Sequence, residues 1–399
     1  MNIFKKIYCR IFQKAFHFAI PVLPYRNPEI LKSCSDVPEV LLKNKIDKVL
    51  IVTDEFLHTS GHADKLKKAL DKARIKYIVY DKTVPNPTVS NVEEARKIYI
   101  ESKCKGLIGI GGGSSIDCAK AVGARIARPK KTISKMEGIL HIVKPTPFTV
   151  AIPSTAGTGS EVTVTTVITD DKTHHKFPIS DFPLIPNACV HDWEITKTLP
   201  PHLTATTGMD ALTHAIEAYI GLSTVKSTRK DALKAVKLIS ENLYIAYKDS
   251  NNKEARQNML TASFLAGRAF SKSYVGYCHA VAHSLGGKYS IPHGLANAVL
   301  LPYTLENYGK SAYKKYKNIA IAMGIATKDT PLDDAAKMLI AKIRQMNKEM
   351  GIPEKLSGIK ADDIPLLASY ADKEANPLYP VPKLFDKHEL KKFYFDVME

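Results

Sequence analysis

The chain changes character at Pro200–Pro201, and this change limits the folds that it can adopt. Before that point short apolar runs alternate with segments of helical periodicity, and after it helical periodicity continues to the C-terminus. Strands that alternate with helices indicate a parallel sheet covered by helices, with the ligand at the carboxyl ends of the strands. We predict an α/β domain on a doubly wound parallel sheet over residues 29–199 and an all-α domain over residues 200–399, preceded by an arm of residues 1–28. The predicted sheet strands are residues 49–52, 77–80, 106–110 and 148–152.

The composition excludes several other classes of protein. The 57 Lys and Arg residues outnumber the 40 Asp and Glu residues, which gives a net charge of +17. These cations are spread along the chain without a nucleic-acid-binding motif, so we predict no nucleic-acid partner. The six cysteines lie far apart without a C-x-x-C pair, which favours free thiols and a cytoplasmic location. No run approaches the roughly 18 consecutive apolar residues of a membrane-spanning helix.

Residues 1–20 predict an amphipathic helix. Four cations occupy one face and no acidic residue interrupts them, which allows peripheral contact with an anionic membrane. The alternative is that the apolar face docks on the body of the protein or on a second subunit. A cleaved signal peptide is disfavoured because cations interrupt the first sixteen residues. The cations are Lys5, Lys6, Arg10 and Lys14, and the apolar positions are Ile3, Phe4, Ile7, Tyr8, Ile11, Phe12, Ala15, Phe16, Ala19 and Ile20.

A glycine-rich turn follows the third predicted strand directly. Gly111, Gly112, Gly113 and Ser114 lead into a helix, and such a turn lets the backbone and the helix N-terminus approach a pyrophosphate. A glycine-rich turn alone is weak evidence, but the strand–turn–helix setting favours a phosphate-binding loop. Asp54, at the end of the first strand, is placed to bind ribose hydroxyls and to repel a 2′-phosphate, which favours NAD over NADP. Its alternative role is to cap a helix.

The helical half carries an unusual set of histidines beside an aspartate. Asp210 and His214 are four residues apart, as are His279 and His283, so each pair shares one helix face. His293 follows between a proline and a glycine. A lone histidine is more often part of a core or surface, but two such pairs with a third histidine favour a divalent metal site. Three imidazoles and one carboxylate suit Fe²⁺ or Zn²⁺.

Four segments resemble those of the iron-containing (group III) alcohol dehydrogenase family: GGGSSIDCAKAVG, STAGTGSEVT, GMDALTHAIEAY and GYCHAVAHSLGG-x5-PHG. The resemblance covers about residues 45–399. It implies a dehydroquinate synthase-like fold, in which a dinucleotide-binding α/β domain precedes a helical domain and the active site lies in the cleft between them. The resemblance does not extend to the segment before Lys45, and the amphipathic arm is an addition to the family pattern.

The resemblance also implies roles for individual residues. Asp210, His214, His279 and His293 match the metal ligands, and His283 matches a second histidine near the reacting centre that is not a ligand. As a catalytic residue, His283 is expected to relay a proton toward solvent or the cofactor ribose. Phe270, Val275 and Thr165 match pocket-lining positions and imply a small, partly apolar substrate. The cofactor-binding positions are Asp54, Asn86, Gly111, Gly112, Gly113, Ser114, Ser154, Thr155, Thr158, Val167 and Lys176.

The predicted function is that of a metal-dependent NAD(H)-linked alcohol dehydrogenase or aldehyde reductase. Its substrates would be small primary alcohols or aldehydes, and its cofactors Fe²⁺ (or Zn²⁺) and NAD. One alternative is a metal- and NAD-dependent lyase or cyclase resembling dehydroquinate synthase, which would want several cations around His279–His293. Another is a membrane-associated, non-catalytic scaffold. A homo-oligomer is expected from the general prevalence of symmetric assemblies.

Overall fold

A computed structural model describes residues 1–173 and 175–399 of the chain. Its contacts divide the chain into two compact units. The α/β unit comprises Pro24–Leu199, and the helical unit comprises Pro200–Glu399 together with Met1–Leu23. The predicted three-part division into residues 1–28, 29–199 and 200–399 stays a prediction about domains.

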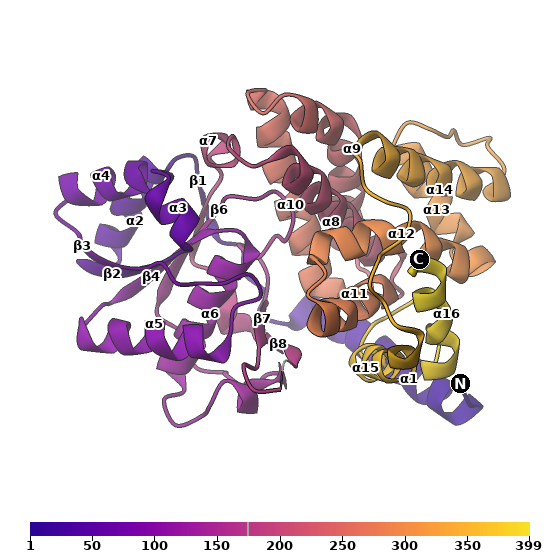
Figure 1. Ribbon diagram of the computed structural model, residues 1–399, viewed down its shortest axis with the longest axis horizontal. Helices are drawn as coiled ribbons and strands as arrows, with labels where there is room; N and C mark the ends of the chain where they lie inside the picture. Colours follow the sequence, from indigo (N-terminus) through magenta and orange to yellow (C-terminus); the bar gives the residue numbers. More distant parts are fainter. Residues whose placement is uncertain (174) are drawn as a thin grey trace. The chain divides into compact units, whose positions relative to one another are not determined.

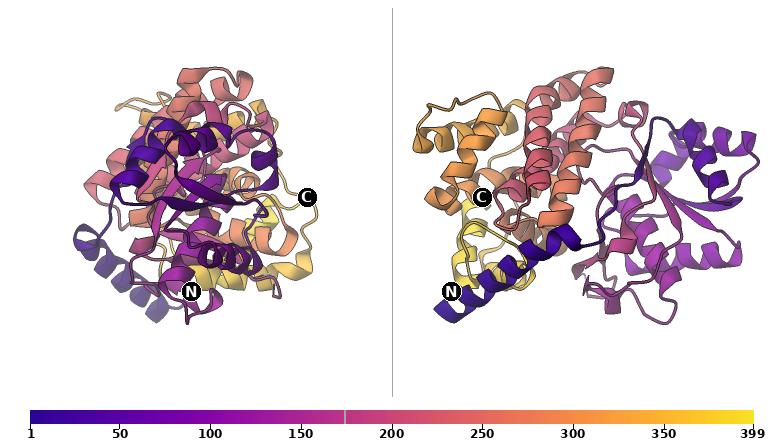
Figure 2. Two further views of the ribbon diagram at one scale, coloured as in Figure 1. Left: turned by 90° about the vertical axis from the view of Figure 1, so that its left-hand side faces the viewer. Right: turned by 180° about the vertical axis from the view of Figure 1, so that it is seen from behind.

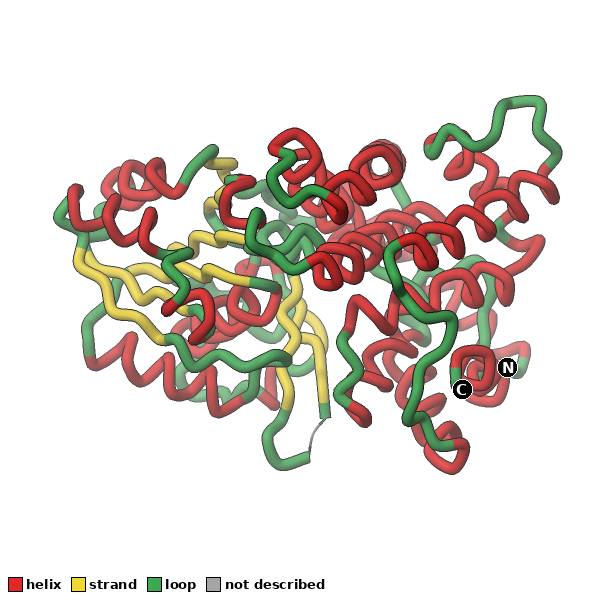
Figure 3. The backbone as a smooth tube through the Cα atoms, turned by 45° about the horizontal axis from the view of Figure 1, so that its top comes forward, coloured by secondary structure: helices red, strands yellow, loops and turns green. Residues whose placement is uncertain are grey.

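A six-stranded parallel sheet forms the centre of the α/β unit, in the order β1-β9-β6-β4-β2-β3 (Figure 3, yellow). The four predicted strands are present, each extended by one residue. β1 and β9 have only three residues each, which is too short for a sequence pattern to indicate them. The strands are β1 (Glu29–Leu31), β2 (Lys48–Val52), β3 (Lys76–Tyr80), β4 (Gly106–Gly111), β6 (Phe148–Pro153) and β9 (Ala188–Val190).

Helices cover both faces of this sheet. Alternate residues of β2 point to opposite faces, so that Leu50 and Val52 join one buried core while Val49 and Ile51 join another. The first core includes residues of the helices α5 and α6, and the second includes residues of α2 and α4. A strand buried on both faces needs an apolar residue at every position, as these runs have. The helices of the unit are α2 (Val37–Lys43), α3 (Glu55–Thr59), α4 (Asp64–Lys72), α5 (Val89–Glu101), α6 (Gly113–Ala127) and α7 (Trp193–Thr196).

A second, three-stranded sheet was not predicted from the sequence. Its order is β5-β8-β7, with β8 antiparallel to β7 and parallel to β5. Six of the ten residues of β7 and β8 are only partly buried and several are threonine, serine or lysine, so they give no continuous apolar run. The strands are β5 (Gly138–Ile139), β7 (Thr165–Thr169) and β8 (Lys176–Ser180).

The helical unit is arranged around α8, which begins at Pro201 and ends at Ile220. Every residue from Gly208 to Ile220 is buried, and α8 packs against α9, α10 and α12 (Figure 1). The predicted fold class, a parallel α/β domain followed by a helical domain, is confirmed. The remaining helices of this part are α9 (Lys226–Lys248), α10 (Lys253–Ser273), α11 (Tyr277–Tyr289), α12 (His293–Tyr308), α13 (Tyr313–Ala322), α14 (Leu332–Glu349), α15 (Ile364–Ala375) and α16 (Lys387–Val397).

The N-terminal arm forms one long helix, α1 (Ile3–Ala19), capped by the side chain of Asn2. It packs along the outside of the helical unit, beside the C-terminal segment (Figure 2, right). The arm therefore docks on the body of the protein through one of its faces. Among the described helices, α1 included, none is long and apolar enough to cross a membrane.

Candidate metal centre

Four side chains from three helices meet in the helical unit. Asp210 and His214 lie one turn apart on α8, His279 lies on α11, and His293 is the first residue of α12. One ligand atom from each of the four lies within 4.8 Å of the others. The structure thus brings together the four residues that the sequence singled out as metal ligands, and α12 packs against both α8 and α11.

Asp210 is the centre of this cluster. Its carboxylate oxygens lie 3.9 Å from Nδ1 of His214, 3.7 Å from Nε2 of His279 and 3.6 Å from Nε2 of His293. Burial raises the pKa of this carboxyl group, but the imidazoles of His214, His293 and His279 more than offset it, so that the pKa lies well below its ordinary value. A buried, ionised carboxylate among imidazoles is the donor chemistry of a divalent transition-metal site.

A second carboxylate orients one of the imidazoles. Oε2 of Glu217 accepts a 2.6 Å hydrogen bond from Nδ1 of His279. Glu217 also accepts backbone N–H bonds from Gly276 (2.8 Å) and Cys278 (2.9 Å), so it caps the start of α11. Burial lowers the pKa of His279, but the carboxylates of Asp210 and Glu217 more than offset this effect and raise the pKa to about 9. This arrangement leaves Nε2 of His279 directed at Asp210.

The donor set fits a metal ion. Nε2 of His279 is buried and has no hydrogen-bond partner among the described residues, although a buried imidazole nitrogen without one is costly. Asn297 donates a 2.7 Å hydrogen bond to Oδ1 of Asp210, and the ring of Phe270 stacks on His214 with centroids 4.2 Å apart. Three nitrogens and one oxygen, held in place by a second layer of contacts, suit Fe²⁺ or Zn²⁺.

His283 stands beside this cluster without joining its four donors. It lies one turn after His279 on α11, and its ring stacks on that of His293 with centroids 5.0 Å apart. Its Nδ1 lies 2.7 Å from Oε1 of Glu374, which also accepts a 2.7 Å hydrogen bond from the hydroxyl of Tyr379. The Glu374 carboxylate therefore fixes the orientation of the His283 ring.

The glycine turn of the α/β unit joins β4 to α6. Gly111 has φ +148°, a backbone conformation that residues with a side chain rarely adopt, and the N-cap residue of α6 is Gly112, which has no side chain to cap the helix. A Cβ atom on Gly113 would lie 2.7 Å from Cγ2 of Thr158, which is closer than real Cβ contacts. On Gly112 it would approach Thr155 no closer than 3.6 Å. The missing Cβ of Gly113 therefore lets the start of α6 pack closely against Thr158.

Several other predicted cofactor positions lie around this turn. The N–H of Ser154 donates to the carbonyl of Gly111 (2.8 Å), because β6 neighbours β4 in the sheet. The N–H of Asn86 donates to Oγ of Ser114 (3.3 Å), and Nζ of Lys176 donates to Oδ1 of Asn86 (2.8 Å). These hydrogen bonds link Ser154 and Asn86 directly, and Lys176 through Asn86, to the loop.

Asp54 and Val167 have other partners. Oδ1 of Asp54 accepts the N–H of Leu57 at 3.0 Å and caps α3, which is the alternative role that the sequence left open. The N–H of Val167 donates to Oδ2 of Asp117 at 2.8 Å. Within residues 1–173 and 175–399, neither residue forms a hydrogen bond to the glycine turn.

Two family models match almost the whole chain. The model described as iron-containing alcohol dehydrogenase matches residues 31–193, and that described as Fe-containing alcohol dehydrogenase family, C-terminal, matches residues 204–398. The chain belongs to the iron-containing alcohol dehydrogenase family. The two matches meet near the boundary between the α/β unit and the helical unit.

Relatives of known activity and structure support this membership. The 1,3-propanediol dehydrogenase of Citrobacter freundii is 36% identical over 385 residues, covering 96% of this chain and 98% of the relative. The NAD-dependent methanol dehydrogenase of Bacillus methanolicus is 36% identical and covers 81% of this chain and 85% of the relative. The crystal structure of a 1,3-propanediol oxidoreductase superposes with a TM-score of 0.89 at 36% identity, covering 93% of this chain and 98% of that structure.

Sequence reasoning missed the residues that orient the family's site. Glu217 follows Asp210 by seven residues and so lies on the same helix face, a spacing that the sequence showed. Asn297 follows His293 by four residues and had the same signal. Glu374 lies 91 residues after its partner His283, and only the packing of α15 against α11 brings the two together.

Proposed function

We propose that the protein is a metal-dependent, NAD(H)-linked alcohol dehydrogenase or aldehyde reductase with Asp210, His214, His279 and His293 as its metal ligands. The observation that carries the proposal is the convergence of these four donors within 4.8 Å, in a chain of the iron-containing alcohol dehydrogenase family. Fe²⁺ or Zn²⁺ would supply Lewis-acid polarisation of an alcohol or carbonyl oxygen.

The protein's own residues prepare this site. Asp210 brings a single negative charge to a divalent cation, so the ligand set stays net positive toward a substrate oxygen. Glu217 holds the ring of His279 through Nδ1 and thereby presents Nε2 to the other donors. The same carboxylate is anchored by two backbone N–H groups of α11, which limits the freedom of the ligand before any ion binds.

His283 is proposed as the residue that exchanges a proton during the reaction. Glu374 engages Nδ1, so Nε2 is the nitrogen that would accept or release the proton. The hydroxyl of Tyr379 donates to the same Glu374 oxygen and holds that carboxylate in place. A fixed ring at the edge of the ligand cluster suits proton transfer near the substrate.

The cofactor site is proposed at the glycine turn. Gly111, Gly112, Gly113 and Ser114 would hold the pyrophosphate at the start of α6, and NAD would accept or supply the hydride. Oδ1 of Asp54 caps α3, so Oδ2 is the oxygen proposed to face the ribose. Its charge would disfavour a 2′-phosphate. The positions proposed to line the rest of the cofactor site are Asn86, Ser154, Thr155, Thr158, Val167 and Lys176.

The substrate class is proposed to be small primary alcohols or the corresponding aldehydes. The named activities of the relatives, on 1,3-propanediol and methanol, support it. Phe270, stacked on His214, supplies an apolar wall beside the proposed metal. The lyase or cyclase alternative has less support, because the residues flanking His279 on α11 include Ala280, Val281 and Ala282 rather than cations. The complete donor set also disfavours a non-catalytic scaffold.

Location and assembly are separate proposals. All six cysteines are buried and free, which supports a reducing compartment such as the cytoplasm. The homo-oligomer stays a prediction.

Activity measurements on protein reconstituted separately with Fe²⁺ and Zn²⁺ test the main proposal. We expect NADH formation from short primary alcohols and aldehyde reduction in reverse, with lower kcat/KM for NADP(H) than for NAD(H). Each activity should depend on the metal content measured in the same sample. Full turnover by protein without bound metal, or steady conversion without net NADH formation, would contradict the proposal.

A further inference from the structure

We propose that the outward face of α1 is a docking surface for an anionic lipid bilayer. The inference is independent of the proposed reaction, because α1 holds none of the residues placed in the metal or cofactor sites. It rests on how α1 is fastened, on what it leaves exposed and on the charges beside the exposed stripe.

The inner face of α1 is fastened to the helical unit by specific contacts. Gln13 is buried, and its amide donates to the carbonyl oxygens of Tyr379 (2.7 Å) and Pro377 (3.2 Å). The Lys5 ammonium pairs with Asp372 at 2.8 Å, and Cys9 is fully buried. The orientation of the helix is therefore fixed, with polar as well as apolar residues turned toward the protein.

The outer face carries the apolar stripe. Phe4 is 80% exposed and Ile11 is 64% exposed. At 100° per residue this stripe lies on the side of the helix opposite to Cys9 and Gln13. A surface helix of a globular protein normally turns its apolar residues to the core, whereas α1 leaves a large part of its apolar set exposed. The exposed members are Ile3, Phe4, Ile7, Tyr8, Ile11 and Phe18.

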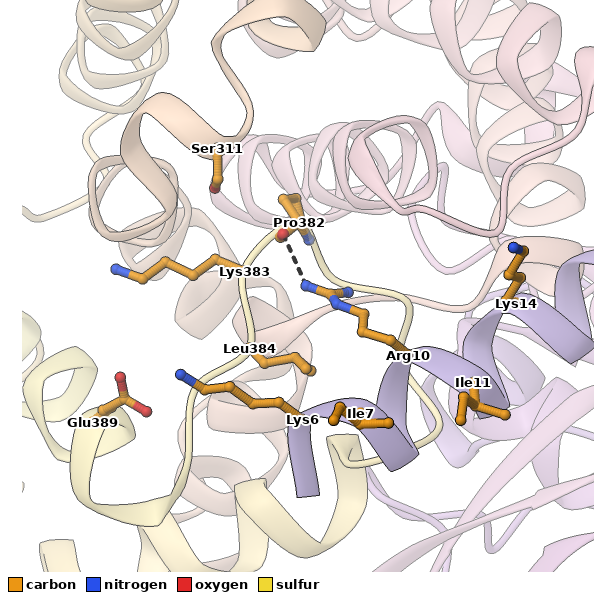
Figure 4. Close-up of a pocket in the computed structure, with 10 residues that line it drawn as sticks. All are labelled: Lys6, Ile7, Arg10, Ile11, Lys14, Ser311, Pro382, Lys383, Leu384 and Glu389. Carbon is orange, nitrogen blue, oxygen red and sulfur yellow. Dashed lines mark hydrogen bonds between the residues drawn. The ribbon is translucent and has the colours of Figure 1, made fainter. Parts of the chain in front are cut away.

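Cations lie between this stripe and the C-terminal segment on which α1 packs. Lys6 and Lys14 are exposed, and they lie with Arg10 beside a groove of about 510 Å³ (Figure 4). Across the groove stands Lys383, and Glu389 is the single acidic residue that lines it. The guanidinium of Arg10 donates to the carbonyl oxygens of Val381 and Pro382, which fixes its position in the groove wall. These cations are therefore complementary to phosphate headgroups.

Charge decides between the candidate occupants. A second copy of the chain would bring the same cations against these, since a two-fold interface pairs a patch with itself. An anionic bilayer offers phosphates to the cations and an acyl boundary to Phe4 and Ile11, as interfacial amphipathic helices require. Because α1 is apolar on one face only, it suits docking in the headgroup layer and does not suit spanning the bilayer.

Vesicle binding by the full-length protein tests the inference. The probes are vesicles of equal parts phosphatidylglycerol and phosphatidylcholine, and vesicles of phosphatidylcholine alone, in a flotation assay at low and high salt. We expect binding to the anionic vesicles at low salt. This binding should weaken in about 0.5 M salt, because salt screens the attraction between exposed charges. Binding to phosphatidylcholine alone should be at least about tenfold weaker.

Two double variants separate the contributions of the stripe and its cations. F4E/I11E should lower the partition coefficient at least about tenfold, and K6Q/K14Q should lower it by about tenfold and flatten the salt dependence. The matched controls are F395E, at a 52% exposed phenylalanine on α16, and K226Q/K230Q, at exposed lysines on α9. The controls should bind as the unaltered protein does, and thermal unfolding and alcohol oxidation should be unchanged in all four variants.

Three results would overturn the inference. The first is an absence of binding to anionic vesicles at low salt. The second is an equal loss of binding in the controls. The third is a fall in sedimentation mass in F4E/I11E without any vesicle binding by the unaltered protein, because that result assigns the face to contact between copies of the chain. If the unaltered protein binds anionic vesicles but does not oxidise alcohols, that result would count against the proposed reaction and not against the docking surface.

Discussion

The candidate metal centre depends on side chains, whereas the glycine turn depends on their absence. In the helical unit, Asp210 and His214 project from successive turns of a helix that is buried from Gly208 onward. In the α/β unit, the start of α6 packs closely against Thr158 because Gly113 carries no Cβ. The two sites should therefore be sensitive to opposite changes. Removal of side-chain atoms should impair the metal centre, whereas addition of atoms should impair the glycine turn.

The largest expected effect comes from removing a ligand. His279→Ala should abolish metal retention and lower kcat/KM by at least about 10³-fold, since the lost imidazole is one of only four donors. Metal analysis and steady-state kinetics on the purified variant measure both. The matched control is His202→Ala, an exposed histidine on α8 outside the cluster, which should retain metal and turnover. Full metal content in H279A would show that metal retention does not depend on the His279 side chain.

The next effect concerns the carboxylate behind that ligand. Glu217→Gln should weaken metal binding about 10–100-fold, because an amide cannot accept all three hydrogen bonds that Glu217 now accepts. Competition with a chelator measures the affinity. Glu241→Gln, at an exposed position on α9, serves as the control. Equal affinities in E217Q and E241Q would show that the donors alone determine metal binding.

A smaller effect is expected where an atom is added. Gly113→Ala places a Cβ 2.7 Å from Cγ2 of Thr158, so the turn must shift and NAD should bind about tenfold more weakly. Gly123→Ala in the same helix meets its neighbours only at ordinary contact distances, the shortest being 3.4 Å to Thr146, and should leave NAD affinity unchanged. Calorimetric titration with NAD measures both. Metal content should be unaltered in G113A. Loss of metal from this variant would show that the two sites are not independent.

The smallest effect concerns the two residues beside the candidate metal centre. Glu374→Gln should lower kcat roughly fivefold with little change in KM, because the His283 ring loses its orienting carboxylate. The same substitution in a His283→Ala background should have no further effect, since the two residues act through one hydrogen bond. Glu354→Gln, an exposed glutamate, is the control. Additive losses in the double variant would assign Glu374 a role apart from His283.

The parts predicted from the sequence are those whose signals are local. The apolar runs of the parallel sheet are continuous because both sheet faces are covered, and the Asp210–His214 pair shares a helix face by its spacing. The strands β7 and β8 escaped prediction because their residues alternate between buried and half-buried positions without a continuous apolar run.

The N-terminal arm shows the limit of periodicity. Its helix was predicted, but the apolar set divides in the structure: Ile20 turns inward with Cys9 and Gln13, while Phe4 and Ile11 turn outward. A helical pattern cannot tell which part of a wide apolar face meets the protein. That choice depends on partners such as Asp372 and Tyr379, which are more than 360 residues away in the chain.

The contacts of Glu217 determine how the protein responds to chemical damage and to substitutions near α11. One carboxylate grips both an imidazole and the first backbone amides of α11, so the register of that helix and the aim of the imidazole cannot drift apart. We therefore expect any chemical modification or substitution that loosens the start of α11 to lower metal occupancy first, in molecules that are still folded.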